Sequence, residues 1–127
     1  MDDDKVWIDN LTNKIKKSSA AFNISWYVGI VGLDCWEIFK DIPDYLRTSE
    51  EFMQMASVSK EFMNFFEEKI HAKEWSYSSS VDGMAKKMID ALEKLEKLTS
   101  IPEKVEKAIS MAISNCKNII DDNNYAK

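Results

Sequence analysis

The scarcity of glycine and proline is the feature that most constrains how this chain can fold. Its 127 residues contain three glycines and two prolines, too few to turn the corners of a β-sandwich or a barrel. The chain is instead rich in lysine, glutamate, methionine and alanine, which are good helix formers. The predicted fold class is therefore all-α: a single compact bundle of four to five helices in one domain spanning residues 1–127.

Apolar residues recur at helical spacing in five segments. The first places Trp7, Leu11 and Ile15 on one face, and residues 18–21 then allow a break or a bend. A frayed tail, residues 121–127, is expected to follow the last segment. The five predicted segments are residues 4–17, 22–40, 48–73, 81–98 and 100–120.

The second segment is apolar on almost every face. A helix of this kind is usually the central one, so we expect the other helices to wrap around it. Gly29 and Gly32 lie inside the segment and would allow another helix to approach closely. The alternative is a buried strand over residues 26–33, for which the chain offers no partner strand.

Two capping boxes predict where helices begin. Thr48-Ser-Glu-Glu51 combines a hydroxyl with a carboxylate three residues later, and each side chain can satisfy a free backbone N–H. Ser100-Ile-Pro-Glu103 repeats the pattern and adds a proline in the first turn, where its missing N–H has no consequence. Helices are therefore predicted to start after Thr48 and after Ser100.

The two cysteines, Cys35 and Cys116, both fall on the apolar faces of predicted helices. A disulfide between them would close a loop of about eighty residues, which the chain-entropy treatment values at roughly 4–5 kcal/mol. The alternative is two unrelated buried thiols in a cytosolic protein. We predict the disulfide. Two cysteines and one histidine are too few donors for a structural zinc site.

Catalytic groups are sparse. His71 is the only histidine, and Glu68-Lys-Ile-His71 matches one half of a di-iron site whose second histidine does not exist here. A histidine at the negative end of a helix, paired with a nearby glutamate, explains it as well. The three glycines form no phosphate-binding loop. We therefore predict a protein that is not an enzyme, with no catalytic residue, no cofactor and no metal.

The net charge of −5 argues against a general nucleic-acid binder, which needs a cationic surface. No apolar run reaches the roughly eighteen residues of a membrane span. The start, Met1-Asp-Asp-Asp-Lys5, lacks the basic and apolar regions of a signal peptide. It fits a cytosolic start, or a start residue placed before a mature secreted chain. Residues 1–5 are expected to be flexible or added to the natural sequence.

Three aromatic residues in predicted loops are the candidates for partner binding: Tyr45, Trp75 and Tyr77. The aromatics on the helical stripes are assigned to core packing; they are Trp7, Trp26, Phe39, Phe52, Phe62 and Phe66. Methionines on several helices offer the alternative of an adaptable cavity for a small hydrophobic ligand. These are Met53, Met55, Met63, Met84, Met88 and Met111.

The length, the helical pattern, the acidic start Asp2-Asp-Asp-Lys-Val-Trp7 and the pair Cys35 and Cys116 together resemble the small salivary proteins of anopheline mosquitoes, of the albicin and anophensin type. The resemblance implies a secreted inhibitor of host defence that binds a host plasma protein complex, the alternative complement pathway convertase. An inhibitor of the contact (kallikrein–kinin) pathway is the other function it implies. We expect a monomer.

Two further classes of function stay open from the residues. One is a cytosolic viral or parasite helical adaptor of the Bcl-2 type, in which a groove receives a partner's helix. The other is a carrier of small hydrophobic ligands. A large closed cavity would favour the carrier.

Overall fold

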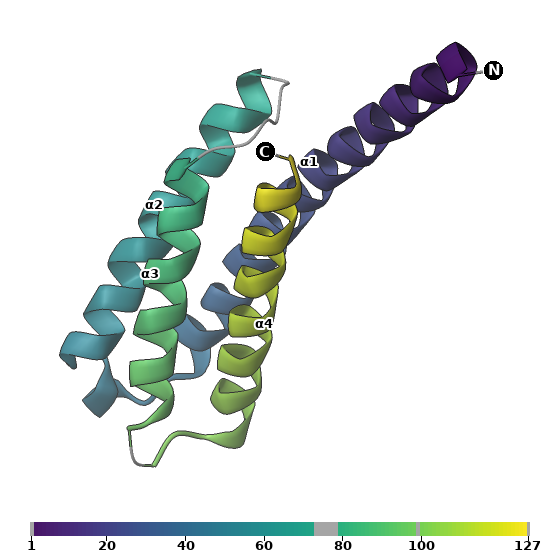
Figure 1. Cartoon of the computed structure of the whole chain (residues 1–127). Coiled ribbons are helices and arrows are strands. Elements are labelled where there is room, and N and C mark those ends of the chain that lie inside the picture. The colour runs from purple at the N-terminus through teal and green to yellow at the C-terminus, as the bar shows by residue number, and fades with distance from the viewer. Residues whose placement is uncertain (1, 73–78, 99, 127) are drawn as a thin grey trace.

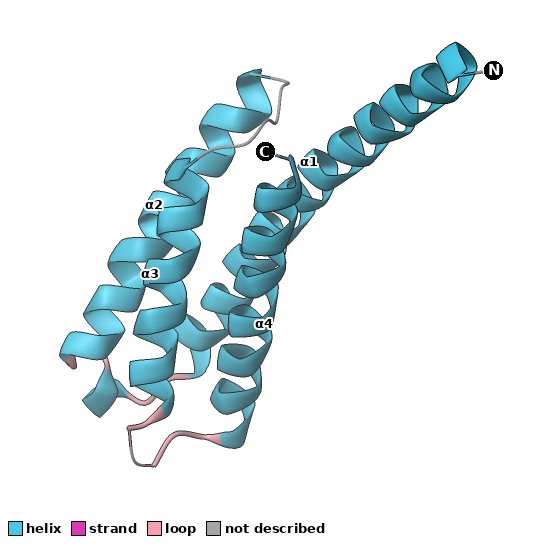
Figure 2. Cartoon of the chain, in the orientation of Figure 1, coloured by secondary structure: helices cyan, strands magenta, loops and turns pink. Residues whose placement is uncertain are grey.

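The computed structural model describes residues 2–72, 79–98 and 100–126, and it describes their side chains except those of residues 2–4, 13–22, 69–72 and 126. The described chain is helical, with short loops and no strand (Figure 2). The predicted all-α class is confirmed, and the alternative strand over residues 26–33 is wrong. The elements are α1 (Asp2–Asp41), the 3₁₀ helix η1 (Asp44–Leu46), α2 (Glu50–Ala72), α3 (Ser79–Glu96) and α4 (Glu103–Ala126).

The four α-helices form an antiparallel up-and-down bundle (Figure 1). Helix α1 packs against α4 and α2, and α3 packs against the same two helices from the other side. Among these four pairs of neighbouring helices, the contact between α1 and α4 is the most extensive and that between α1 and α2 is the least. This uneven packing leaves the seam between α1 and α2 the most open in the bundle.

Helix α1 is one uninterrupted helix of 40 residues, where the sequence indicated two helices with a break at residues 18–21. That stretch, Ser-Ser-Ala-Ala, contains neither glycine nor proline, and alanine is the strongest helix former. Figure 1 shows the N-terminal half of α1 extending beyond the other helices. All described side chains from Lys5 to Thr12 are exposed, so none of the described helices buries this part of α1.

The inner face of α1 is buried, and its outer face is not. The buried side chains of the inner face are Ile24, Val28, Val31, Cys35, Ile38 and Ile42. Trp26, Leu33 and Trp36 lie on the outer face, and Leu33 is 67% exposed. The expectation that this segment is wrapped on every side is therefore wrong for the outer face. A helix in a four-helix bundle contacts only two neighbours, which leaves a face toward solvent.

The other three helices supply the rest of the core. Phe52 and Phe62 of α2 are buried, as predicted, whereas Trp7 and Trp26 are exposed and contradict their assignment to core packing. Phe39 stands edge-on to Phe52, with ring centroids 5.3 Å apart and planes at 82°. This aromatic pair joins the C-terminal part of α1 to the start of α2.

The start of α2 lies one residue later than the sequence indicated. The hydroxyl of Ser49 accepts a hydrogen bond from the backbone N–H of Phe52 at 3.2 Å and donates one to the carbonyl of Leu46 at 2.6 Å. Ser49, and not Thr48, is therefore the N-cap of this helix.

The start of α4 also differs from the predicted capping box. Ser100 has a φ of 65°, outside the extended region that an N-cap residue adopts. The carbonyl of Pro102 accepts the N–H of Glu106 at 3.0 Å, and the helix begins at Glu103. Pro102 thus precedes the first turn instead of lying within it.

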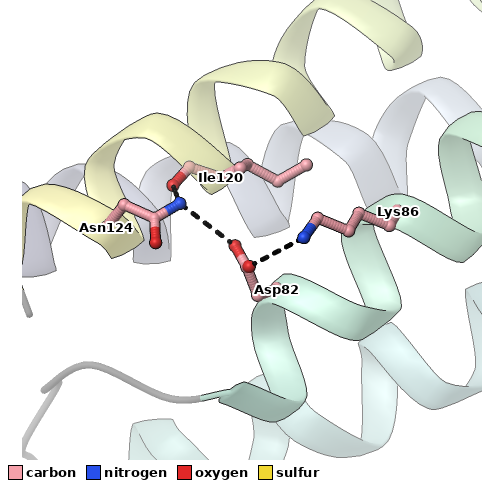
Figure 3. Close-up of polar contacts among 4 residues, drawn as sticks. All are labelled: Asp82, Lys86, Ile120 and Asn124. Atoms are coloured by element: carbon pink, nitrogen blue, oxygen red, sulfur yellow. Dashed lines mark hydrogen bonds and ion pairs between the residues drawn. The ribbon is translucent and has the colours of Figure 1, made fainter.

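The C-terminal residues continue α4 to Ala126, where the sequence indicated a frayed tail from residue 121. Asn124 uses its side-chain amide to donate hydrogen bonds to the carbonyl of Ile120 at 2.9 Å and to Asp82 at 3.5 Å (Figure 3). Asp82 also pairs with Lys86 at 3.3 Å. These contacts hold the end of α4 beside the first turn of α3.

The N-cap of α2 can be tested by removing its hydroxyl. Ser49→Ala is expected to lower the free energy of unfolding by about 1 kcal/mol, because the N–H of Phe52 loses its partner. Thr48→Ala is the matched control and should leave the free energy within about 0.5 kcal/mol. Urea unfolding followed by circular dichroism measures both. A larger loss for Thr48→Ala than for Ser49→Ala would contradict the assignment.

Candidate functional site

Of the three aromatic residues predicted to bind a partner, the structure describes only Tyr45. Tyr45 lies in η1 with an exposed ring, and its hydroxyl donates a hydrogen bond to the carbonyl of Ser100 at 2.8 Å. Its polar end therefore links two loops at one end of the bundle. Trp75 and Tyr77 lie outside the described residues.

Cys35 and Cys116 are both free, buried thiols in the structure, which does not support the predicted disulfide. They lie on α1 and α4 at the most extensive helix contact. Burial raises the pKa of the Cys35 thiol to about 11, against a weaker lowering by its hydrogen bond with Ser59. Burial also raises the pKa of Cys116, and Cys35 adds to that rise. Both thiols are therefore protonated at neutral pH.

Asp34 is a buried carboxyl at the same contact between α1 and α4. Its oxygen accepts a hydrogen bond from the side-chain amide of Asn115 at 3.2 Å. Burial raises the pKa of Asp34; the bond from Asn115 opposes this and the charge of Glu37 reinforces it. The charged carboxylate of Asp34 is therefore less stable in the folded protein than it would be in water.

An apolar cleft opens between α1 and α2, and we call it the α1/α2 cleft. Its volume is about 250 Å³. Phe62 and Met88 form part of its buried floor, and the exposed side chains of Trp36 and Met63 stand at its mouth. The complete lining is Val31, Gly32, Cys35, Trp36, Phe39, Ser59, Phe62, Met63 and Met88.

The chemistry of this lining suits binding and not catalysis. None of the nine lining residues carries a charge. The Cys35 thiol is a poor nucleophile because its pKa is raised to about 11 by burial. The hydroxyl of Ser59 donates to the sulfur of Met55 at 3.5 Å, and no base lies among the lining residues to activate it. The cleft can accept an apolar group of a few carbons.

Two shallower depressions continue along the same seam. One shares Phe39, Ser59 and Met63 with the cleft and adds Met53 and Lys60. The other lies further up the seam, where its lining is Ser25, Trp26, Gly29, Ile30, Leu33 and Phe66. The seam therefore carries apolar side chains along much of its length.

The six methionines expected to line an adaptable cavity lie in several places, and two of them, Met63 and Met88, line the α1/α2 cleft. Met55 and Met88 are buried in the core, Met63 is at the mouth of the cleft, and Met111 lies on α4 in a depression that Glu103 also lines. Gly32, but not Gly29, allows another helix to approach closely, as the sequence indicated for both. A Cβ at position 32 would stand 3.4 Å from the sulfur of Met63, so the small residue lets α2 come near.

Sequence reasoning missed the exposed side chains at the mouth of the cleft and along α1: Trp26, Leu33, Trp36 and Met63. A signal for the first three was present, because they recur at helical spacing in a register distinct from the buried one. The segment is apolar in both registers, and the pattern alone cannot say which of them faces the core.

Among the described residues, no group of three or more histidine, cysteine, aspartate or glutamate side chains could hold a metal ion. His71 lies in α2 near its end, and its side chain lies outside the described part. None of the described helices combines the length and the apolarity needed to cross a membrane.

In comparisons with known proteins, no protein-family model, no curated protein and no solved structure matches this chain significantly. The likeness to salivary proteins therefore stays a prediction.

The buried carboxyl of Asp34 generates a prediction on pH. Burial raises the pKa of Asp34 in the folded state, so the folded protein favours the neutral carboxyl. This contribution to the free energy of unfolding is fully present below the unfolded-state pKa of about 3.9. It is lost as the pH rises through the folded-state pKa. Asp34→Asn is therefore expected to raise the Tm at about pH 7, and the difference should shrink toward about pH 3.

Asp90→Asn is the control of opposite sign. A bond from Lys94 at 3.0 Å lowers the pKa of the exposed Asp90 carboxyl, so its charge favours folding at neutral pH. This variant should not raise the Tm. Thermal unfolding of Asp34→Asn and Asp90→Asn across the pH range measures both effects, and a lower Tm for Asp34→Asn at neutral pH would refute the reasoning.

Proposed function

We propose that this chain is a binding protein without catalytic activity, and that the α1/α2 cleft holds an apolar side chain of a protein partner. The observation that carries the proposal is the cleft: about 250 Å³ of uncharged space on the most open seam of the bundle. Burying one large apolar side chain there is favourable by roughly 1.5–3 kcal/mol. Exposed apolar surface around the cleft adds area for further contacts.

The size and the mouth of the cleft favour a partner's side chain over a free lipid. Pockets for small molecules usually measure about 300–1,000 Å³ and enclose most of the ligand. This cleft is smaller, and its mouth lies between Trp36 and Met63, which are 62% and 55% exposed. Tryptophan is a frequent hot-spot residue, and methionine adapts its shape to a partner.

The alternative complement pathway convertase is the partner we propose, with the chain acting as a secreted inhibitor. Support for this target comes from the resemblance in length, in the acidic start Asp2–Trp7 and in the pair Cys35 and Cys116. The cleft supplies a surface on which a plasma protein of this kind can be held. Target and surface are separate parts of the proposal.

Lysis of erythrocytes by the alternative pathway tests both parts. Wild type is expected to inhibit lysis at roughly micromolar concentration. Met63→Lys should weaken inhibition about tenfold or more, because the lysine charge at the mouth must lose water when the partner binds. Met111→Lys is the matched control. Met111 is about as exposed as Met63, but it lies on α4, away from the cleft.

The possible outcomes separate target from surface. Absence of inhibition by wild type at micromolar concentration would exclude the convertase as the target. Inhibition by wild type that Met63→Lys leaves unchanged would exclude the α1/α2 cleft as the surface. A loss with Met111→Lys equal to that with Met63→Lys would point to a general effect of added charge.

A further inference from the structure

Helix α1 carries a second apolar face, whose large side chains are exposed wherever the structure describes them. We call it the α1 outer stripe. Its positions follow one another at steps of three and four residues. Steps of four, four and three add up to eleven residues, or about three helical turns, so the positions stay on one face of the helix. Every large side chain of the stripe that the structure describes is exposed. The stripe consists of Trp7, Leu11, Ile15, Ser18, Phe22, Trp26, Gly29, Leu33 and Trp36.

The N-terminal part of the stripe is not buried by any of the described helices. All described side chains from Lys5 to Thr12 are exposed, and this part of α1 leaves the bundle (Figure 1). A single helix in water gains most of its stability from packing an apolar face. Trp7 and Leu11 contribute to stability only when something covers them. The stripe therefore has the properties of an interface.

We propose that a second copy of this chain covers the stripe, with the two α1 helices antiparallel about a two-fold axis near position 22. The spacing of the stripe is nearly the same in both directions from that position. The axis puts Leu11 of each copy opposite Leu33 of the other, and Trp7 close to Trp36. A two-fold interface requires such self-complementarity. This inference goes beyond the proposed function and replaces the expected monomer by a dimer.

At two places along this arrangement a large residue meets a small one. Position 15, an isoleucine, falls opposite Gly29, and Trp26 falls opposite position 18, a serine. Apart from the adjoining backbone of α1 and the two neighbouring residues, no atom lies within 4 Å of the place where a Cβ on Gly29 would stand. Gly29 also lines a depression of about 350 Å³, together with Trp26 and Leu33 of α1 and Phe66 of α2. Such a depression is a hole for an apolar side chain of a facing helix. A parallel pair would instead place Trp26 against its own copy.

Charge at the ends of the stripe also favours the antiparallel pair. Position 4 is an aspartate and position 40 is a lysine, and both fall in the register of the stripe. The antiparallel pair places each aspartate opposite Lys40 of the other copy, so that unlike charges meet at both ends. A parallel pair would bring like charges together at both ends, which disfavours association.

The exposed area is of the order that a dimer needs. Trp7, Trp26 and Trp36 are each more than half exposed, and an aromatic side chain can bury about 150–250 Å². Three of them provide on the order of 400 Å² per copy. That is about half of the roughly 800 Å² that each partner buries in a standard interface, and the leucines and flanking residues extend it.

Sedimentation velocity of the full chain tests the dimer. At about 100 µM, well above the Kd of a standard interface, wild type is expected to sediment as a dimer. Leu33→Glu should raise the dimer Kd by about 100-fold, because the buried charge occurs twice in each dimer. Met111→Glu is the matched control on α4, also exposed, and should leave the Kd unchanged. Circular dichroism establishes that each variant is helical.

Cross-linking tests the register. Leu11→Cys and Leu33→Cys are mixed and oxidised with copper phenanthroline, which takes two electrons and two protons from each pair of thiols. Disulfides between position 11 of one copy and position 33 of the other should predominate in tryptic maps. Cys35 and Cys116 should not react, because both are buried and their thiol pKa values are raised.

Three results would overturn the proposal. The first is a wild-type chain that sediments as a monomer at about 100 µM. The second is an equal loss of association with Leu33→Glu and Met111→Glu. The third is cross-linking of position 11 to 11 and of 33 to 33, which would mean a parallel pair. If the natural partner of the stripe is a different protein, the chain alone would sediment as a monomer.

Discussion

The packing of the inner face of α1 on α4 is the contact on which the rest of the structure depends. It is the most extensive contact between any two helices of the bundle. Asp34 accepts a hydrogen bond from Asn115 across it, and Cys35 lies near enough to Cys116 to raise its pKa. Because α4 takes this face, α2 can reach only the flank of α1. The loose flank contains the α1/α2 cleft, and the opposite face remains open as the α1 outer stripe.

The two surfaces of α1 have different characters. The α1/α2 cleft is a short, deep site whose floor, including Phe62 and Met88, belongs to the core. The α1 outer stripe is long, and it continues to Trp7 on the part of α1 that extends beyond the other helices. Trp36 stands at the border of both. A protein partner held at the cleft and a second copy on the stripe can therefore influence one another through this side chain.

The helical class and the core of α2, α3 and α4 could be predicted from the sequence, because each of these helices has one apolar face. Phe52, Phe62 and Leu95 are buried where that pattern placed them. Helix α1 could not be predicted in the same way. Residues 24, 28 and 31 and residues 26, 33 and 36 both follow helical spacing, so the choice of inner face depends on the helix that packs there.

Capping motifs and loop aromatics in the sequence also predicted the structure only in part. Ser49 caps α2 in place of the adjacent Thr48, and its hydroxyl accepts the N–H of Phe52 and donates to the carbonyl of Leu46. The candidate site was missed because the sequence pointed to loop aromatics such as Tyr45, whose hydroxyl is used by Ser100 within the chain. The side chains at the mouth of the cleft come from α1 and α2, and only the packing of the two helices brings them together.

Hydrogen–deuterium exchange of the amides in residues 5–21, measured as a function of protein concentration, tests most directly whether the N-terminal half of α1 depends on a second copy. A dimer of the two α1 helices predicts slow exchange at about 100 µM and much faster exchange after dilution well below the dimer Kd that sedimentation gives. Exchange in residues 24–38, which pack on α4, should stay slow at both concentrations. Exchange in residues 5–21 that stays the same on both sides of the Kd would contradict the dimer.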